Sequence, residues 1–231
     1  MKLIFLHGSG GCKESWRHQV GFFADADAVD LPGHPGGEPC ASIGEYVQWL
    51  REYIQEGAYR NIVLVGHSLG GAIAFLYALE YPDDLDGIIS VGSGARLRVH
   101  PMYLEGLEKA IGKPELFEEF QATGRELIEP ELAEVLRRRG IENGPAVTLN
   151  DLRACDEFDI MNRLGEIRAP TLAICGSDDI MTPPKYSHHL VEKIPDAREV
   201  IVQGGTHMVF AEKPGEVNAA IEEFLQGLQR R

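Results

Sequence analysis

The segment Gly66–Gly71, which reads Gly-His-Ser-Leu-Gly-Gly, constrains the fold most because its two flanks differ in pattern. Residues 62–65 before it are apolar and β-branched, as in a buried strand, and residues 72–80 after it are good helix formers. A Gly-x-Ser-x-Gly pentapeptide between a strand and a helix is typical of a sharp turn that strains its serine and exposes the hydroxyl. A β-carbon on either glycine would collide with a neighbouring element. The hypothesis is a strained, accessible Ser68, and the alternative is a surface serine in a glycine-rich turn.

Short apolar runs and helical patterns alternate along the chain. The expected strands are Leu3–Leu6, Ala26–Asp30, Ile62–Val65, Gly87–Val91, Thr171–Cys175 and Arg198–Val202. The middle runs are apolar at consecutive positions, which indicates strands covered on both faces, as in a parallel sheet. Helices are expected around Ser15–Phe23, Ser42–Glu56, Ala72–Tyr81, Lys185–Ile194 and Glu216–Leu228. This alternation predicts an α/β fold with a doubly wound, mostly parallel sheet of about six strands.

Residues 95–165 break the alternation, because their apolar residues have helical spacing and no strand pattern is present. Prolines that favour a first helical turn punctuate the segment at Pro101, Pro114, Pro130 and Pro145. Thr148–Asp151 has the spacing of a capping box that would open the last helix. The basic run Arg137–Arg139 is interpreted as a solvated helix end, with phosphate binding as the alternative. We therefore expect a helical cap at 95–165, inserted in a core formed by 1–94 and 166–231.

Charge and composition exclude several classes of partner. The 231 residues carry a formal net charge of −14, which argues against nucleic acid or an anionic membrane surface. No apolar run is long enough to span a membrane, and the apolar N-terminal run is too short for a secretory signal. The four cysteines are widely spaced, which suits a reducing cytoplasm and predicts no zinc site or other metal. They are Cys12, Cys40, Cys155 and Cys175.

A serine hydroxyl is a poor nucleophile at neutral pH unless a base and a group that orients this base lie beside it. Catalytic groups of α/β folds gather at the carboxyl ends of the strands, so the strand-end loops are the place to look. The loop after the fifth expected strand contains Asp178 and Asp179, and the loop after the sixth contains His207. The loop after Val91 contains no carboxylate. We favour Asp179 as the acid, with Asp178 as the alternative, and His207 as the base, with helix capping as the alternative.

Acyl transfer also requires donors for an oxyanion. The backbone N–H of Leu69, just past the serine, is the first candidate, and the loop after the first strand supplies the second. In that loop we assign the N–H of Ser9, since it follows His7-Gly8. His7 and His34 are expected to order loops, and His67 is taken as the variable residue of the turn. The remaining histidines are expected at the surface or in the cap: His18, His100, His188 and His189.

Over essentially the whole chain, these residues resemble the α/β-hydrolase superfamily. The resemblance implies a Ser68-His207-Asp179 triad, because the family's acid lies three residues after a glycine and four before a proline. Serine in the turn is unlike the dehalogenase and epoxide-hydrolase branches, and Leu69 differs from the methionine of haloperoxidases and many C–C hydrolases. The motif residues are His7-Gly8, Asp30-Leu31-Pro32-Gly33-His34, Ser68, Pro170-Thr171, Gly176, Asp179, Pro183, Gly205 to Met208, Glu212 and Pro214.

The resemblance implies a cofactor-free serine hydrolase acting on small to medium carboxylic esters through an acyl-enzyme. A thioesterase, a C–C bond hydrolase and a non-enzymatic ligand-binding protein are the alternatives. We expect a small apolar ester as partner and a monomer or homodimer. The cap is expected to line an apolar acyl pocket. The candidates for that lining are Met102, Tyr103, Leu104, Phe117, Phe120 and Phe158.

Overall fold

The protein, described over residues 1–230 by a computed structural model, is built on one parallel sheet. Within these residues the sheet has six strands in the order β2-β1-β3-β4-β5-β6, and the expected fold class is confirmed. The order reverses between β1 and β3, so this is the switch point at which α/β sheets place their ligands. The strands are β1 (Lys2–Leu6), β2 (Ala26–Val29), β3 (Ile62–His67), β4 (Leu85–Val91), β5 (Thr171–Gly176) and β6 (Ala197–Val202).

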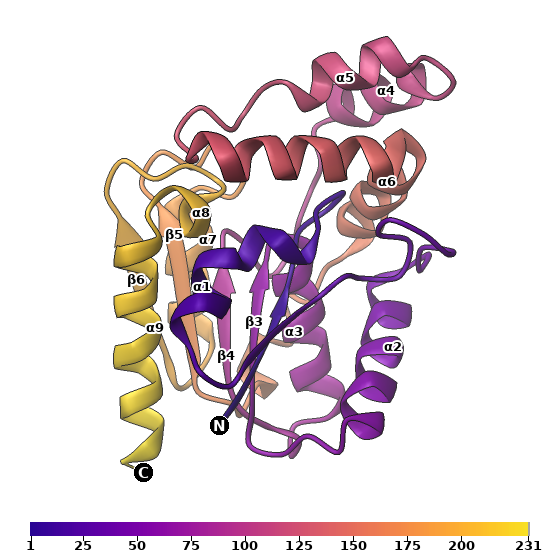
Figure 1. The fold of residues 1–231 in the computed structure, drawn as a ribbon. Helices are drawn as coiled ribbons and strands as arrows, with labels where there is room; N and C mark the ends of the chain where they lie inside the picture. The colour runs from indigo at the N-terminus through magenta and orange to yellow at the C-terminus, as the bar shows by residue number, and fades with distance from the viewer. Residues whose placement is uncertain (231) are drawn as a thin grey trace.

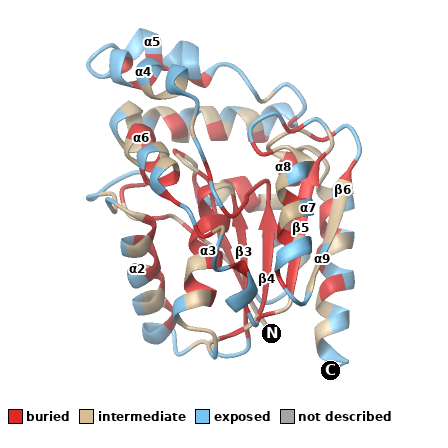
Figure 2. Cartoon of the chain, turned by 180° about the vertical axis from the view of Figure 1, so that it is seen from behind, coloured by how far each residue is buried: buried red, intermediate tan, exposed pale blue. Residues whose placement is uncertain are grey.

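Helices cover both faces of the sheet (Figure 1). One face packs on α2 (Ile43–Glu56), α3 (Leu69–Glu80) and α7 (Pro184–Lys193). The other packs on α9 (Pro214–Gln229), with the short α1 (Arg17–Phe22) and α8 (Val209–Glu212) beside it. Side chains of β3 alternate between the two apolar clusters, and Figure 2 shows the central strands buried. This two-sided burial is the reason for their uninterrupted apolar runs.

The helix expected over Ser15–Phe23 forms as two short pieces instead, the 3-10 helix η1 (Lys13–Trp16) and α1. Trp16 lies at the break and is fully buried, with its ring 4.0 Å from that of Phe210 and 5.0 Å from that of Phe5. The chain thus buries this indole in the core at the point where a continuous helix would have run on. A further 3-10 turn, η2 (Leu164–Glu166), precedes β5.

Between β4 and β5 lie α4 (Pro101–Ala110), α5 (Pro114–Gln121) and α6 (Pro130–Glu157), above the carboxyl ends of the strands (Figure 1). Each begins with a proline, as expected. The capping box expected at Thr148–Asp151 is wrong. The chain restarts as helix at Pro145 after Gly144, whose φ of 81° breaks α6, and the Thr148 hydroxyl donates back to the Gly144 carbonyl.

Packing divides this segment in two. A small cluster of its own contains Leu107, Phe117 and Leu149 from α4, α5 and α6. Both ends of α6 instead join the main core clusters, through Leu132 near its start and Cys155 near its end. The long helix is therefore packed as part of the core, although its sequence lies inside 95–165.

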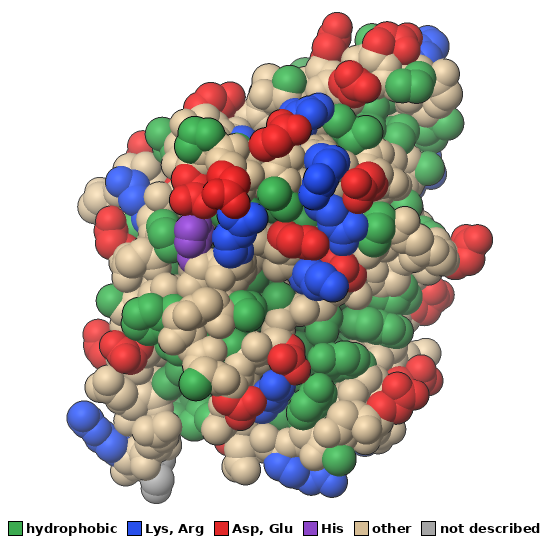
Figure 3. Space-filling view, viewed as in Figure 1, with side chains coloured by type: hydrophobic (Ala, Val, Ile, Leu, Met, Phe, Trp, Pro, Cys, Tyr) green, Lys and Arg blue, Asp and Glu red, His purple; other side chains and the backbone are tan. Residues whose placement is uncertain are grey.

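Arg139 from the basic run is nearly buried and contacts Glu14 and Asp30, which ties α6 to η1 and to the loop after β2. Arg137 and Arg138 pair with neighbouring glutamates on the surface of the helix. Acidic and basic side chains are interspersed on the face shown in Figure 3. No helix within residues 1–230 combines the length and the apolar character needed to cross a membrane.

Candidate active site

Ser68 occupies a strained turn between β3 and α3. Its φ of 50° and ψ of −112° lie in a region that side-chain-bearing residues rarely adopt, and the Ser93 hydroxyl donates to its carbonyl over 2.8 Å. A β-carbon on Gly66 would lie 2.1 Å from the Gly70 carbonyl oxygen, and one on Gly70 would lie 2.3 Å from that of Leu6. Only glycine fits at either position, which explains the spacing of the pentapeptide.

The loops after β5 and β6 bring Asp179 and His207 together. Asp179 is buried, and its Oδ2 lies 2.9 Å from Nδ1 of His207. Its Oδ1 accepts the backbone N–H groups of Met181 and Thr182, each over 2.8 Å. Asp178 points elsewhere: it is exposed and accepts a hydrogen bond from the hydroxyl of the preceding serine. The geometry therefore favours Asp179 over its neighbour as the partner of the histidine.

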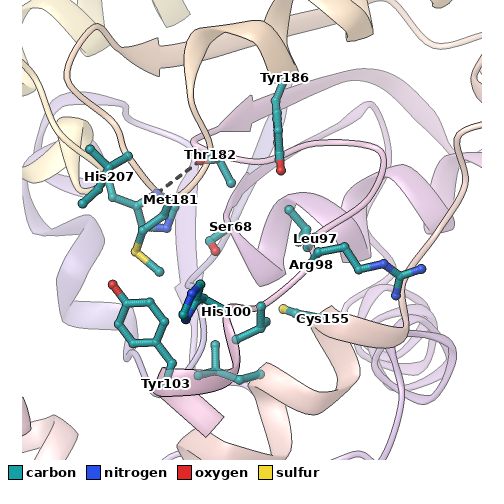
Figure 4. Close-up of a pocket in the computed structure, with 13 residues that line it drawn as sticks. Ser68, Leu97, Arg98, His100, Tyr103, Cys155, Met181, Thr182, Tyr186 and His207 are labelled. Atoms are coloured by element: carbon teal, nitrogen blue, oxygen red, sulfur yellow. Dashed lines mark hydrogen bonds between the residues drawn. The ribbon is translucent and has the colours of Figure 1, made fainter.

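The electrostatics of this pair suit a histidine that gains charge. Burial by itself would raise the pKa of Asp179, but hydrogen bonds from His207 and Thr182 lower it to about 2. The carboxylate is therefore ionised at neutral pH and stabilises an imidazolium. Thr182 was not anticipated from sequence. Its hydroxyl donates to Oδ2 of Asp179 over 2.8 Å and lies 3.2 Å from Nδ1 of His207 (Figure 4).

Ser68 and His207 line the same cavity (Figure 4). Within residues 1–230 no hydrogen bond joins them in this structure, and such contacts are commonly long until substrate binds. Since Nδ1 of His207 is committed to Asp179, Nε2 is the nitrogen left for the serine. His67 was taken as merely variable, but it is buried and its Nε2–H donates to the His207 carbonyl over 3.0 Å.

Two candidate oxyanion donors flank the serine. Leu69 is the first residue of α3, and the first N–H groups of a helix have no acceptor within it. The loop after β1 lies against the turn, because a β-carbon on Gly8 would be 3.3 Å from that of Ser68. Ser9 follows, with its Oγ 3.6 Å from Sγ of Cys155 in the cavity wall. Ser9 and Leu69 thus belong to the two segments that meet at the turn of Ser68.

His7 anchors this loop, as expected. Its Nδ1–H donates to the Gly8 carbonyl over 2.8 Å, and its Nε2 accepts the backbone N–H of Leu31 over 3.0 Å. One donor and one acceptor define a neutral ring. Burial, reinforced by the positive charge of nearby His34, lowers the pKa of His7 to about 4.

The cavity has a volume of about 230 Å³. Tyr103, one of the expected pocket residues, lies in its wall. The other five are elsewhere: Phe117 and Leu104 pack among α4, α5 and α6, Phe158 lies in the core, and Met102 and Phe120 are exposed. Helical spacing shows which side chains share a face but not whether that face meets a helix or a cavity.

The apolar wall comes instead from loop residues that no periodicity could reveal, among them Leu97, Val99, Ile180 and Met181. Cys155 also lines the cavity. Burial raises the pKa of this thiol to about 12, so it is protonated and a poor nucleophile at neutral pH. Among residues 1–230 no group of three or more potential ligands could hold a metal ion.

A strained serine and a His–Asp pair at the carboxyl edge of a parallel sheet form the arrangement that acyl transfer would use. A family profile described as "Alpha/beta hydrolase family" matches residues 3–220. The chain belongs to the alpha/beta hydrolase family. Family and relatives together support a hydrolase.

Three relatives show the range of this similarity. The chain is 28% identical to the pimeloyl-[acyl-carrier protein] methyl ester esterase of Aeromonas hydrophila, over 96% of this chain and 94% of that protein. It is 30% identical to the 2-hydroxy-6-oxo-6-phenylhexa-2,4-dienoate hydrolase of Comamonas testosteroni, over 97% of this chain and 87% of that one. A solved structure of a thermophilic esterase superposes with a TM-score of 0.82 at 34% identity, covering 98% of this chain and 90% of the other.

Proposed function

We propose that this protein is a serine hydrolase that cleaves small to medium carboxylic esters through an acyl-enzyme on Ser68. The observation that carries the proposal is the 2.9 Å contact of His207 with Asp179 at the cavity that contains the strained serine. Binding alone would require neither this pair nor a nucleophile held in a costly conformation. This argues against a non-enzymatic binding protein.

In the proposed reaction Ser68 Oγ attacks the ester carbonyl carbon while Nε2 of His207 takes the hydroxyl proton. The carbonyl oxygen becomes an oxyanion that accepts the N–H groups of Ser9 and Leu69. The intermediate collapses, the C–O bond breaks, and the alcohol leaves with the proton from His207. A water molecule then attacks the acyl carbon while His207 takes its proton. The bond to Ser68 Oγ breaks, His207 returns the proton to Oγ, and the carboxylic acid is released.

Cavity size and the named relatives support the substrate class. About 230 Å³ lies below the usual range of drug-sized sites, so a short acyl chain fits better than a long one. The aligned relatives include an esterase at 34% identity and a methyl ester esterase at 28%. The dienoate hydrolase at 30% identity keeps C–C bond cleavage as the second candidate.

A fluorophosphonate probe tests the nucleophile. We expect wild-type protein to be labelled stoichiometrically, Ser68→Ala to be unlabelled, and the matched control Ser177→Ala to react like wild type. Unreactive wild-type protein would overturn the proposal.

Initial rates on p-nitrophenyl acetate, butyrate and octanoate, an acyl-CoA and a dienone ketoacid then separate the candidate reactions. We expect the acetate and butyrate esters to give the highest kcat/KM. A preference for the dienone or the thioester would replace the ester assignment while leaving the triad in place.

We also propose a cytoplasmic location. Cys12, Cys40, Cys155 and Cys175 are all free thiols in this structure, as suits a reducing compartment. Localisation of a tagged full-length chain by cell fractionation tests this, and recovery outside the cytoplasm would contradict it.

A further inference from the structure

Asp151 of α6 is a buried carboxylate that the proposed reaction does not use. Its side chain is fully shielded from solvent and accepts three hydrogen bonds from separate parts of the core. Oδ2 accepts the backbone N–H of Gly10 over 2.8 Å and Nε2–H of His34 over 2.9 Å, and Oδ1 accepts the Tyr46 hydroxyl over 2.7 Å. The loop after β1, the loop after β2 and helix α2 therefore meet at one side chain of α6.

The hydrogen bonds of His34 favour a charged ring. Its Nδ1 lies 3.0 Å from the Pro32 carbonyl and 3.2 Å from the Leu31 carbonyl, and a carbonyl oxygen can only accept. Its Nε2 faces the carboxylate of Asp151. Opposite an ionised Asp151 both ring nitrogens donate, and His34 is then an imidazolium buried against a carboxylate. Burial alone would lower the pKa of His34, but Asp151 raises it above its usual value.

The carboxylate of this ion pair also holds the loop after β1, which carries a candidate oxyanion donor. Gly10 immediately follows Ser9, and Nδ2 of Asn143 donates to the carbonyls of Gly10 and Gly11 over 3.0 and 2.7 Å. A β-carbon on Gly10 would lie 2.5 Å from the hydroxyl oxygen of Thr148. Two side chains of α6 thus hold Gly10: Asp151 accepts its N–H, and Asn143 donates to its carbonyl.

We propose that Asp151, paired with protonated His34, and Asn143 are positioning residues that hold the Ser9 N–H where the oxyanion forms. Helix α6 is then a fixed part of the catalytic machinery, and any movement that admits substrate is confined to α4 and α5. The inference rests on the proposed function, since it needs Ser9 as an oxyanion donor. It gives a role to the buried ion pair, because Asp151 holds Gly10, the residue directly after Ser9.

The test compares Asp151→Asn with Tyr46→Phe, which removes a hydrogen bond from the same carboxylate but not from the loop. After active-site titration with the fluorophosphonate, we expect Asp151→Asn to lower kcat on p-nitrophenyl butyrate about 10²-fold, with KM changed less than about threefold. Tyr46→Phe is expected to keep kcat within about threefold. Assays are run well below the melting temperature of each variant.

Inhibitor affinity provides a second measurement, which would not change if Asp151 only stabilised the fold. A trifluoromethyl ketone forms a hemiketal oxyanion on the serine, whereas the matching methyl ketone binds largely as the ground state. We expect Asp151→Asn to weaken the affinity for the trifluoromethyl ketone by about the same factor as it lowers kcat. The affinity for the methyl ketone is expected to stay unchanged. If Asp151→Asn does not fold, Asn143→Ala is expected to show the same pattern.

The outcomes separate this inference from the proposed function. A wild-type protein that never reacts with the fluorophosphonate would remove the proposed function. A reactive wild type whose folded Asp151→Asn variant keeps kcat and the inhibitor ratio within about threefold would overturn this inference alone. So would equal losses in Asp151→Asn and Tyr46→Phe.

Discussion

Two His–Asp pairs in this protein have the same 2.9 Å nitrogen–oxygen distance and different chemistry. His207 meets Asp179 at the cavity, where 16% of the histidine side chain is exposed. His34 meets Asp151 with both side chains fully buried. Within residues 1–230 Nε2 of the first histidine has no hydrogen bond, and the second histidine has both nitrogens beside acceptors. The partner of the second nitrogen therefore decides whether an imidazole can move a proton or only bear a charge.

The sharpest test of this comparison replaces each histidine by glutamine. We expect His207→Gln to lower kcat/KM about 10⁴-fold or more and to change the free energy of unfolding by less than about 1 kcal/mol. His34→Gln leaves Asp151 buried without its countercharge, so we expect about 3 kcal/mol of lost stability and at most about 10² in kcat. Urea unfolding and ester kinetics on both variants measure this. Similar profiles for the two would break the comparison.

A second test uses the adjacent aspartates of the acid loop. We expect Asp179→Asn to lower kcat about 10⁴-fold, because an amide cannot hold the histidine tautomer or stabilise its charged form. Asp178→Asn, which changes an exposed side chain one position away, is the matched control and is expected to stay within about threefold. Steady-state kinetics of both variants on p-nitrophenyl butyrate measure this difference. Comparable losses in both variants would return the acid assignment to Asp178.

The pH dependence of stability sharpens the contrast between neutral and charged buried histidines. His7 has a folded pKa of about 4 against 6.5 for an unperturbed ring, so its stabilising contribution is complete above pH 6.5 and declines as the pH falls to 4. We expect a loss of about 3 kcal/mol over that window, with His67 adding to it because its pKa is also lowered. His34 acts in the opposite sense: its raised pKa gives stability below pH 6.5 that disappears as the pH rises through its folded value.

Urea unfolding at intervals between pH 4 and 7 measures this dependence. The variant His7→Gln is expected to flatten the slope between pH 6.5 and 4, and His18→Gln, at a half-buried surface site, is the control. An unchanged slope in His7→Gln would mean that the ring is not held neutral.

The smallest expected effect concerns Thr182. Its hydroxyl donates to the same oxygen of Asp179 that His207 contacts, whereas the Tyr46 hydroxyl donates to the oxygen of Asp151 that does not face His34. We expect Thr182→Val to lower kcat about three- to tenfold and Thr182→Ser to restore it, because serine keeps the donor. Unaltered kcat in Thr182→Val would show that the backbone N–H groups alone hold this carboxylate in place.

The residues of the proposed triad could be brought together from sequence because parallel strands end at one edge. Ser68, Asp179 and His207 follow β3, β5 and β6, and strand-end loops of one sheet necessarily converge. Thr182 and His67 were missed because no sequence pattern distinguishes a hydroxyl or imidazole that hydrogen-bonds to the proposed triad from one that does not. Most residues expected to line the pocket lie elsewhere, because the apolar periodicity of α4 and α5 reflects the packing of these helices on each other.

Asp151 illustrates the limit most clearly. Its spacing from Thr148 predicts a capping box, a local interaction, yet its hydrogen-bond partners are 105, 117 and 141 residues away along the chain. Local pattern was sufficient to locate the strained turn, through the glycines two positions before and after Ser68, and the strands, through their continuous apolar runs. The charge state of His34 and its hold on the loop of Ser9 arise only when α6 packs over two distant loops, because hydrogen-bond partners so far apart in sequence are selected by packing and by nothing local.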